Sequence, residues 1–441
     1  MLNIRVEQYL KNYFIVLICC YLFCGVCLAD FFEFQNIPTN GGYDLEYFTI
    51  KGDNYIAITN HYSDSSYSQN ACIYKFLDST FVVFQTIPTK GAYDIESFEI
   101  NNETYLAIAN GRNSSTRRLY CKIYKWNGAS FEEFQTIPAN CVIDIEFFRI
   151  LEDEYVAIAN LRSDSKYRVN SKIYKWNNSS FEEFQSIPSK GAADFNFFTI
   201  EDEKYLALAN YYNDSSHKVN SIIYKWNGEN FEDFQEIVTY GAKDWENFQI
   251  DGINYLVVSN MYYNNNYNID SVIYKFNGYE FEEFQTILTH GAICSEFFTI
   301  DNNYYLAFSN QKNGQTSNIK SIIYKWDTNS FLENQQLNTN TSQQISNFEI
   351  GDQQFLALSN YYDGFTRKLN TKIYIWQTPH IDTDNDGVID LFDKCPNTFQ
   401  NSIVYSDGCP SVRGDYSDNQ KLDLTDCIGI LNELIQKHDE N

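Results

Sequence analysis

The C-terminal part of the chain has oxygen-bearing side chains at the spacing of a calcium-binding loop. Carboxylates fall at loop positions 1, 3, 5, 9 and 12, while Gly387 at position 6 allows the sharp turn. Ca²⁺ takes six to eight oxygen ligands, so the pattern predicts a calcium site, whereas a disordered acidic linker would not need this spacing. The predicted ligands are Asp382, Asp384, Asp386, Val388 (through its carbonyl), Asp390 and Asp393.

A second loop with the same spacing follows. Gln420 stands at position 6 in place of glycine, which makes the turn costlier and predicts weaker binding. Both loops end in Asp rather than the longer Glu, which favours structural calcium at extracellular concentrations. The second loop leads into an amphipathic helix predicted over Cys427 to Gln436. Its predicted ligands are Asp415, Ser417, Asn419, Lys421, Asp423 and Asp426.

These loops follow a repeat that occupies most of the chain. Residues 31–380 consist of seven tandem copies of a 50-residue unit, without insertion or deletion. Aligned copies give whole columns of one residue type: Phe48 to Phe348, Ile50 to Ile350, Asn60 to Asn360 and Tyr74 to Tyr374. A period of this length, rich in β-forming residues, predicts an all-β, seven-bladed β-propeller.

Each repeat contains four β-favouring runs, which predict the four antiparallel strands of one blade. In the second repeat they are Tyr93 to Ile100, Thr104 to Ala109, Lys122 to Trp126 and Phe131 to Ile137. The chain begins with a fourth-type run, Phe31 to Ile37, and its repeats end with a third-type run, Ile373 to Trp376. We therefore predict that the first run completes the seventh blade and closes the ring, which removes exposed sheet edges.

One column of carboxylates stands at the start of the first, innermost strand of each repeat. A second column lies two residues on, and therefore on the same face of the strand. A cation such as Ca²⁺ in the central channel would neutralise these groups, whereas each Asp could instead cap its own turn. Both interpretations stay open. The first column is Asp44, Asp94, Asp144, Asp194, Asp244, Cys294 and Gln344, and the second is Glu46, Glu96, Glu146, Asn196, Glu246, Glu296 and Ser346.

Three further patterns limit the function. The Asn60-type column ends the second strand in all seven copies, which we interpret as a turn residue in a left-handed conformation. The five histidines do not adjoin a Ser or Cys nucleophile motif, so we expect no enzyme. The net charge of −26, without a basic patch, argues against nucleic acid as a partner.

The first 29 residues have the features of a secretory signal. Arg5 and Lys11 precede an apolar run, and small residues stand before Asp30 at the expected cleavage point. An uncleaved membrane anchor is the alternative, since the run is close to the length that spans a bilayer. The chain is thus expected outside the cell or on its surface, and seven cysteines remain after cleavage.

The repeat resembles the epilepsy-associated (EPTP) repeat over all 350 of its residues. The resemblance rests on Phe-Gln-x-Ile-Pro-Thr-x-Gly-Ala-x-Asp, Tyr-Leu-Ala-Ile-Ala-Asn and Ile-Tyr-Lys-Trp-Asn-Gly. It implies an extracellular, protein-binding propeller without catalytic activity. The first calcium loop, with its trailing Cys-Pro pairs, resembles a thrombospondin type 3 repeat, which implies a Cys395–Cys409 disulfide. The second resembles half of a type I dockerin, and a full dockerin needs two such halves, so docking to a cohesin is in doubt.

The sequence therefore predicts four parts: a signal peptide at 1–29, a propeller at 30–379, a calcium repeat at 380–411, and a calcium loop with a helix at 412–441. The leading hypothesis is a secreted or cell-surface recognition protein whose propeller binds a protein or glycan. The alternative is a component of an extracellular assembly that docks through its calcium-binding tail, with a cohesin-like or other surface partner. The variable Tyr-rich loops are the plausible contact surface.

Overall fold

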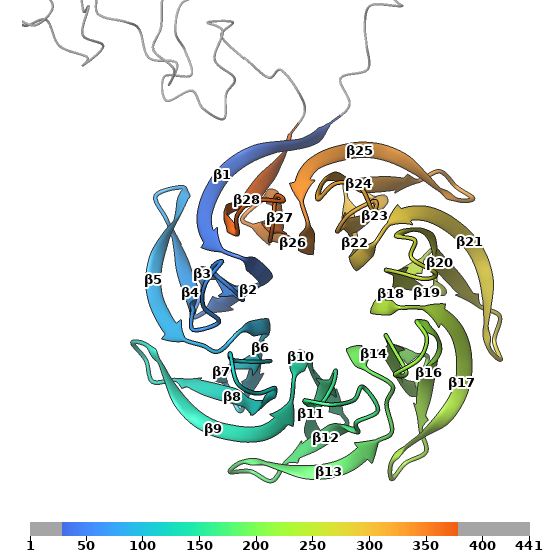
Figure 1. The fold of residues 1–441 in the computed structure, drawn as a ribbon, viewed down its shortest axis with the longest axis horizontal. Coiled ribbons are helices and arrows are strands. Elements are labelled where there is room, and N and C mark those ends of the chain that lie inside the picture. Colours follow the sequence, from blue (N-terminus) through green and yellow to red (C-terminus); the bar gives the residue numbers. More distant parts are fainter. Residues whose placement is uncertain (1–28, 378–441) are drawn as a thin grey trace, which may run out of the picture. The chain divides into compact units, whose positions relative to one another are not determined.

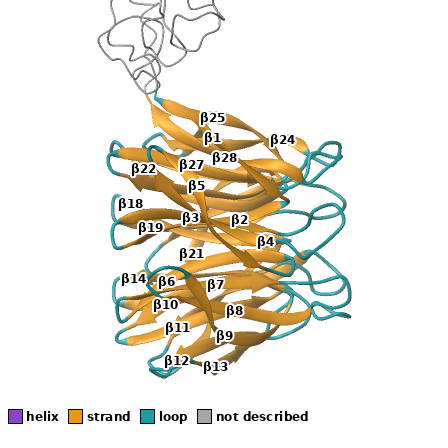
Figure 2. Ribbon diagram, turned by 90° about the vertical axis from the view of Figure 1, so that its left-hand side faces the viewer, coloured by secondary structure: helices purple, strands orange, loops and turns teal. Residues whose placement is uncertain are grey.

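The computed structural model describes residues 29–377, and the two predicted calcium loops, the predicted disulfide and the signal segment lie outside this range. Within it, 28 β-strands form seven four-stranded antiparallel sheets arranged as blades around a central axis (Figure 1). Residues Phe31–Trp376 form one compact unit. The described residues contain no helix, and loops gather at the two opposite faces of the ring (Figure 2).

The strands follow the 50-residue period, with the first of each repeat innermost and the fourth outermost. Blades 1 and 2 are β2 (Gly42–Ile50), β3 (Asp53–Asn60), β4 (Asn70–Leu77), β5 (Thr80–Pro88), and β6 (Ala92–Ile100), β7 (Glu103–Asn110), β8 (Arg118–Trp126), β9 (Phe131–Asn140). Blades 3 and 4 are β10 (Val142–Ile150), β11 (Asp153–Asn160), β12 (Ser171–Trp176), β13 (Phe181–Ile187), and β14 (Ala192–Ile200), β15 (Glu203–Asn210), β16 (Lys218–Trp226), β17 (Phe231–Tyr240).

The remaining blades continue in the same order. Blades 5 and 6 are β18 (Ala242–Ile250), β19 (Ile253–Asn260), β20 (Asn268–Phe276), β21 (Phe281–His290), and β22 (Ala292–Ile300), β23 (Asn303–Asn310), β24 (Asn318–Trp326), β25 (Phe331–Asn340). Blade 7 is β26 (Ser342–Ile350), β27 (Gln353–Asn360) and β28 (Lys368–Gln377), with β1 (Asp30–Asn40) as its outermost strand. The predicted closure of the ring by the first strand is confirmed.

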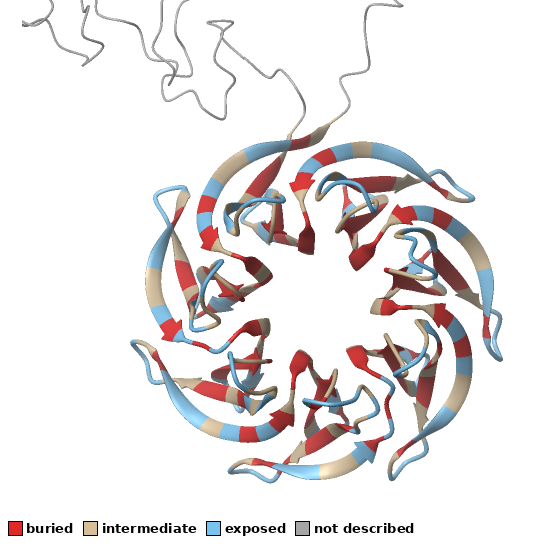
Figure 3. Cartoon of the chain, in the orientation of Figure 1, coloured by how far each residue is buried: buried red, intermediate tan, exposed pale blue. Residues whose placement is uncertain are grey.

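Hydrophobic cores lie between neighbouring blades rather than inside any one of them. Tyr55, Ala57 and Ile73 of blade 1 pack with Ile95 and Leu106 of blade 2, and all five are nearly inaccessible to solvent. Buried residues run along the inner strands of every blade and alternate with exposed ones on the outer strands (Figure 3). Because each sheet buries both faces against its neighbours, a single blade cannot form a core alone.

A glutamine on each outer strand fastens that blade to the next. The side-chain amide of Gln35 donates to the carbonyl of Phe81 and accepts from its amide N–H, both at 2.9 Å. The same two-way contact, here called the glutamine clamp, recurs at every junction, and Gln335 with Phe31 completes the ring at 2.9 and 2.7 Å. The clamps are Gln35–Phe81, Gln85–Phe131, Gln135–Phe181, Gln185–Phe231, Gln235–Phe281, Gln285–Phe331 and Gln335–Phe31.

Loss of the closing clamp should loosen the first strand selectively. Gln335→Leu leaves the N–H and carbonyl of Phe31 without partners, and we expect a loss of about 1–3 kcal/mol in the free energy of unfolding. Hydrogen exchange should quicken in β1, since β28 is its sole partner strand. Gln135→Leu, inside the chain, is the matched control and should leave β1 protection unchanged. Equal exchange of β1 in both variants would contradict a special role for the closing clamp.

Candidate functional site

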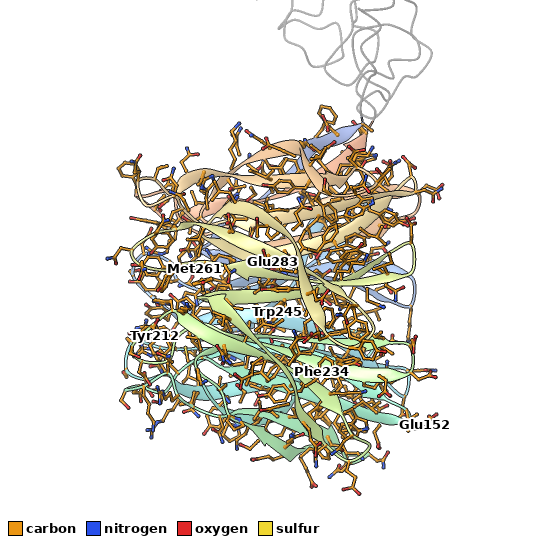
Figure 4. All side chains as sticks on the ribbon, turned by 90° about the vertical axis from the view of Figure 1, so that its right-hand side faces the viewer. Glu152, Tyr212, Phe234, Trp245, Met261 and Glu283 are labelled. Carbon is orange, nitrogen blue, oxygen red and sulfur yellow. The ribbon has the colours of Figure 1, made fainter. Side chains whose placement is uncertain are left out.

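Two adjacent surfaces of the propeller are candidates for function: the central channel, and the face that carries the long loops between the second and third strands of the blades. We call these the channel and the loop face, and the opposite face, which carries the tight hairpin turns, the turn face. Tyr212 lies at the loop face and Glu152 at the turn face (Figure 4). The inner strands start at the loop face, because their first residues pair with the last residues of the second strands.

A bulge at the start of each inner strand brings consecutive residues into the channel. In blade 3 the register shifts between Val142 and Asp144, so the intervening residue is unpaired. The Asp44 column and the column that precedes it by one residue therefore line a cavity of about 110 Å³ at the loop-face end of the channel. The alternation of side chains along a strand predicts that residues 44 and 46 share a face. It does not predict that residue 43 also lines the channel. The lining is Tyr43, Tyr93, Ile143, Ala193, Lys243, Ile293 and Gln343 with Asp44, Asp94, Asp144, Asp194, Asp244, Cys294 and Gln344.

The Asp column fastens each inner strand to that of the next blade. Asp44 Oδ2 accepts the N–H of Ile95 at 2.9 Å, and the other four Asp residues make the equivalent bond at 2.8–3.0 Å. Each of these bonds reaches a residue 51 positions on, so a cap confined to the same turn does not account for them. The bonds are Asp44–Ile95, Asp94–Ile145, Asp144–Phe195, Asp194–Trp245 and Asp244–Ser295.

The Glu column lies two residues further along each inner strand, and fewer of its carboxylates accept a backbone N–H of the next blade. Glu146 accepts the N–H of Phe197 at 2.7 Å, and Glu46 accepts the hydroxyl of Ser97 at 2.6 Å. Desolvation, together with the charges of Glu46 and Glu146 on either side, holds the pKa of Glu96 well above its usual value. Glu96 thus has like-charged neighbours, and its carboxylate accepts no hydrogen bond from residues 29–377.

Burial raises the pKa of nearly the whole carboxylate set. Desolvation raises the pKa of Asp44 and of Asp244 to about 6, although backbone N–H donors oppose the shift. The pKa values of Glu46, Glu146 and Glu296 rise to about 8 for the same first reason. Charge repulsion adds to desolvation for the others, so protons or a cation must neutralise part of the set.

The channel has one cationic side chain among its lining residues. Lys243 occupies the column that holds Tyr43 and Tyr93 in blades 1 and 2, and burial lowers its pKa to about 8. Its ammonium lies 4.6 Å from the centre of the Tyr211 ring. Within residues 29–377, no three Asp, Glu, His or Cys side chains are close enough to bind one metal ion. The channel cation therefore stays a prediction.

The Asn column also connects blades. Asn60 Oδ1 accepts the N–H of Asn40 at 2.7 Å and its amide donates to the carbonyl of Asn70 at 2.9 Å. Asn160 and Asn360 repeat both bonds. The interpretation as left-handed turn residues is wrong, because no member of this column has a positive φ.

Aromatic and basic side chains form a partial ring on the loop face. In each contact, a residue near the end of one long loop packs on a residue near the start of the next, and we call this set the loop-face belt. Its five contacts are Tyr67–Arg112 (4.3 Å), Tyr167–Tyr212 (5.0 Å), His217–Tyr262 (5.0 Å), Tyr267–Lys312 (4.4 Å) and Arg367–Tyr62 (5.1 Å). The rings are half-buried, so the belt presents a surface of fixed shape.

Hydrogen bonds between loops hold the belt at several junctions. Asp64 accepts the N–H of Arg367 at 2.9 Å and the hydroxyl of Thr366 at 2.8 Å, which ties the first long loop to the last. Asp164 and Asp214 make similar bonds to the loops of blades 2 and 3. These loops are therefore braced against one another.

Phe365 is the most exposed large side chain on this face, at 92%. The other six loops have Ser, Asn or Gln at its position. Asp363 Oδ1 accepts the N–H groups of Phe365 and Thr366, each at 2.8 Å, and Gly364 takes a φ of 104° that favours glycine. The loop thus holds the exposed ring on a defined turn.

Comparison with protein families matches the EPTP domain to seven consecutive segments: 30–76, 80–127, 130–177, 180–227, 230–277, 280–327 and 330–377. The segments cover most of the chain, and each contains the outer strand of one blade followed by the three inner strands of the next. The chain belongs to the EPTP family. A comparison with curated proteins gave no match.

The EPTP match establishes the fold and indicates, in general terms, a binding function. The match supports a protein-binding propeller, which agrees with the predicted class. Secretion, calcium binding and the identity of a partner remain predictions. In the described part of the chain, no helix has the length and apolarity needed to cross a membrane.

Three of the four cysteines in residues 29–377, and His61, are packed in the interior of the EPTP propeller. Cys72, Cys121, Cys141 and Cys294 are free thiols, and all but Cys72 are buried. His61 is buried against the rings of Tyr43, Tyr67, Tyr93 and Tyr361, and burial lowers its pKa to about 3. The absence of catalysis stays a prediction.

The raised pKa values predict stability that depends on pH. The affected carboxylates titrate near pH 4 when unfolded and as high as about 8 when folded. Ionisation is easier in the unfolded chain, so it favours unfolding. The contribution of these groups to the free energy of unfolding is therefore greatest below pH 4 and falls as the pH rises towards 8. With a chelator present, the melting temperature should decline over this range. Glu96→Gln should raise it at pH 8 and flatten the decline.

The exposed Glu182 supplies the control for this measurement. Glu182→Gln removes the same charge from the outer strand of blade 3 and should leave the slope of melting temperature against pH unchanged. A wild-type melting temperature that does not decline between pH 5 and pH 8 would contradict the argument from burial.

Proposed function

We propose that this protein is a secreted or cell-surface recognition protein whose loop face binds an extracellular protein or glycan. The proposal rests on the loop-face belt, whose loops are joined by hydrogen bonds, together with the exposed Phe365 on the long loop of blade 7. Tyr and Arg are the residues that most often dominate binding energy at interfaces, because they bury large surfaces at low entropic cost. A rigid surface also loses little conformational freedom on binding.

Phe365 is the proposed anchor of this interface. An exposed Phe at a loop tip costs solubility, and the other six loops avoid it at this position. Arg367 lies beside it in the chain and packs on Tyr62, Tyr361 and Tyr362 at 4.5–5.1 Å. An apolar pocket on a protein partner fits this arrangement best, with the neighbouring belt as the polar rim.

The loop face can be tested by two single substitutions in the full chain. Phe365→Ser restores the residue found in most of the other loops, and we expect it to weaken partner binding at least tenfold without lowering the melting temperature. Tyr279, 86% exposed in a hairpin on the turn face, is the matched control, and Tyr279→Ser should have no effect. Binding is measured on an array of extracellular proteins and glycans. Loss of binding with Tyr279→Ser, but not with Phe365→Ser, would contradict the proposal.

We further propose that the tail binds calcium through the two loops beginning at Asp382 and Asp415. This rests on the ligand spacing of the sequence alone. The tail could then dock the protein into a surface assembly while the propeller displays its loop face. In this arrangement the loop-face substitution would leave attachment intact.

Calcium titration by calorimetry separates the tail from the channel. Asp384→Asn with Asp386→Asn should abolish the stronger binding event, because two ligands of the better loop are lost. Asp94→Asn with Glu96→Gln tests the channel and should lower the measured stoichiometry if a cation binds there. Unchanged binding in the tail variant would contradict the proposed calcium loops.

A further inference from the structure

The outer strands of the blades form the outer rim of the ring, and six of the seven carry carboxylates there. The strand of blade 1, β5, runs from Thr80 to Pro88 without a charged residue. Charged residues on exposed edge strands prevent unwanted association, so their absence from one blade is informative. The acids of these outer strands are Asp30, Glu33, Glu132, Glu133, Glu182, Glu183, Glu232, Asp233, Glu236, Glu282, Glu283 and Glu333.

Blade 1 has lost both members of an ion pair that other blades retain. In blade 2, Lys122 Nζ lies 2.6 Å from Glu133 Oε2, and blades 3 and 7 repeat this pair. The two matching positions in blade 1 hold Cys72 and Val83. Replacement of both partners leaves no unpaired charge, so the surface along β5 has no charge of its own; Lys75, opposite Val82, is paired with Asp53 at 2.7 Å.

The hairpin that ends in β5 also differs from the others. Leu77 replaces the Asn whose side chain shapes this turn in blade 2, where Asn127 accepts the N–H groups of the second and third residues on. Asp78 and Ser79 instead both take positive φ, 47° and 62°, as in a two-residue hairpin turn. Pairing of Leu77 with Thr80 then lengthens the hairpin by one residue pair.

We propose that this uncharged surface, the blade-1 rim, binds the same rim of a second copy of the chain in a two-fold dimer. The rim consists of Leu77, Val82 and Val83, which are 45%, 38% and 62% exposed, together with Cys72. Two molecules of net charge −26 repel one another. Contact through any other rim would place carboxylates against their own copies, whereas the blade-1 rim avoids this and is self-complementary under two-fold symmetry.

The contact is made by side chains rather than by continuation of the sheet. A bulge opposite Tyr74, the glutamine clamp on Phe81 and the missing N–H of Pro88 all hinder pairing along the edge of β5. Antiparallel hairpins would hold the two Asp78 side chains at opposite ends of the contact. The few exposed side chains cover less area than a stable dimer buries, so the dimer is weak and forms as the concentration rises.

Sedimentation of the full chain from micromolar to hundreds of micromolar tests this contact. Wild type should shift from monomer towards dimer. Val82→Glu with Val83→Glu, which restores the repeat pattern, should weaken dimerisation at least tenfold. Ala129→Glu with Ser179→Glu adds the same charge on the turn face and should leave dimerisation unchanged. Thermal unfolding checks that each variant is folded.

Cys72 offers a second measurement within the same surface. It is the one free cysteine of residues 29–377 that is not buried, and peptide mapping separates it from cysteines elsewhere. Its modification by a maleimide should slow as the wild-type concentration rises, but not in the Val82→Glu, Val83→Glu variant. A chain that stays monomeric throughout, or a dimer that survives this double substitution, would overturn the proposal.

Discussion

The propeller depends on hydrogen bonds that side chains of one blade make to the backbone of the next. Within a blade, the sheet satisfies its own backbone groups, but it leaves both faces and an outer edge open. Gln35 and its six equivalents occupy part of that edge, and the Asp44 column does the same at the inner strands. The clamp between Gln335 and Phe31 forms only because the ring closes, with the last blade receiving its missing strand from the N-terminal end of the propeller.

The same requirement accounts for an electrostatic cost at the centre. Each Asp accepts a hydrogen bond more strongly when it is ionised, yet five Asp residues line one narrow channel and the Glu column adds its charge to theirs. The Asp column ends at blade 5, and Cys294 and Gln344 at the same position of blades 6 and 7 carry no charge. Cys294 still points its thiol to the carbonyl of Ile345, at 3.7 Å, so an uncharged side chain retains a contact to the next blade. Fewer charges lower the repulsion that the remaining ones experience.

The fold could be predicted because the same residue types recur at the same position of every 50-residue repeat. The four strands, the seven blades and the closing role of Phe31 to Ile37 all follow from the phase of the repeat. The roles of polar columns could not be predicted, because their partners lie in the next blade. Asn60 and Gln35 recur at every repeat, as core residues do. Their side chains bond to the backbone of a neighbouring blade, and no rule about local sequence predicts a partner so far along the chain. The entry of Tyr43 and Lys243 into the channel needed a bulge that alternation does not reveal.

Function in such a molecule is best sought where a column breaks. A residue present in all seven blades serves the fold that all seven share, as the glutamine clamp does. Phe365 and Val83 depart from their columns at solvent-exposed positions, and each is more apolar than the residues it replaces. Neither change improves packing, because neither side chain is buried. An exposed apolar departure lowers solubility unless another surface covers it, so the loop tip of blade 7 and the rim of blade 1 are the places where a covering surface is expected.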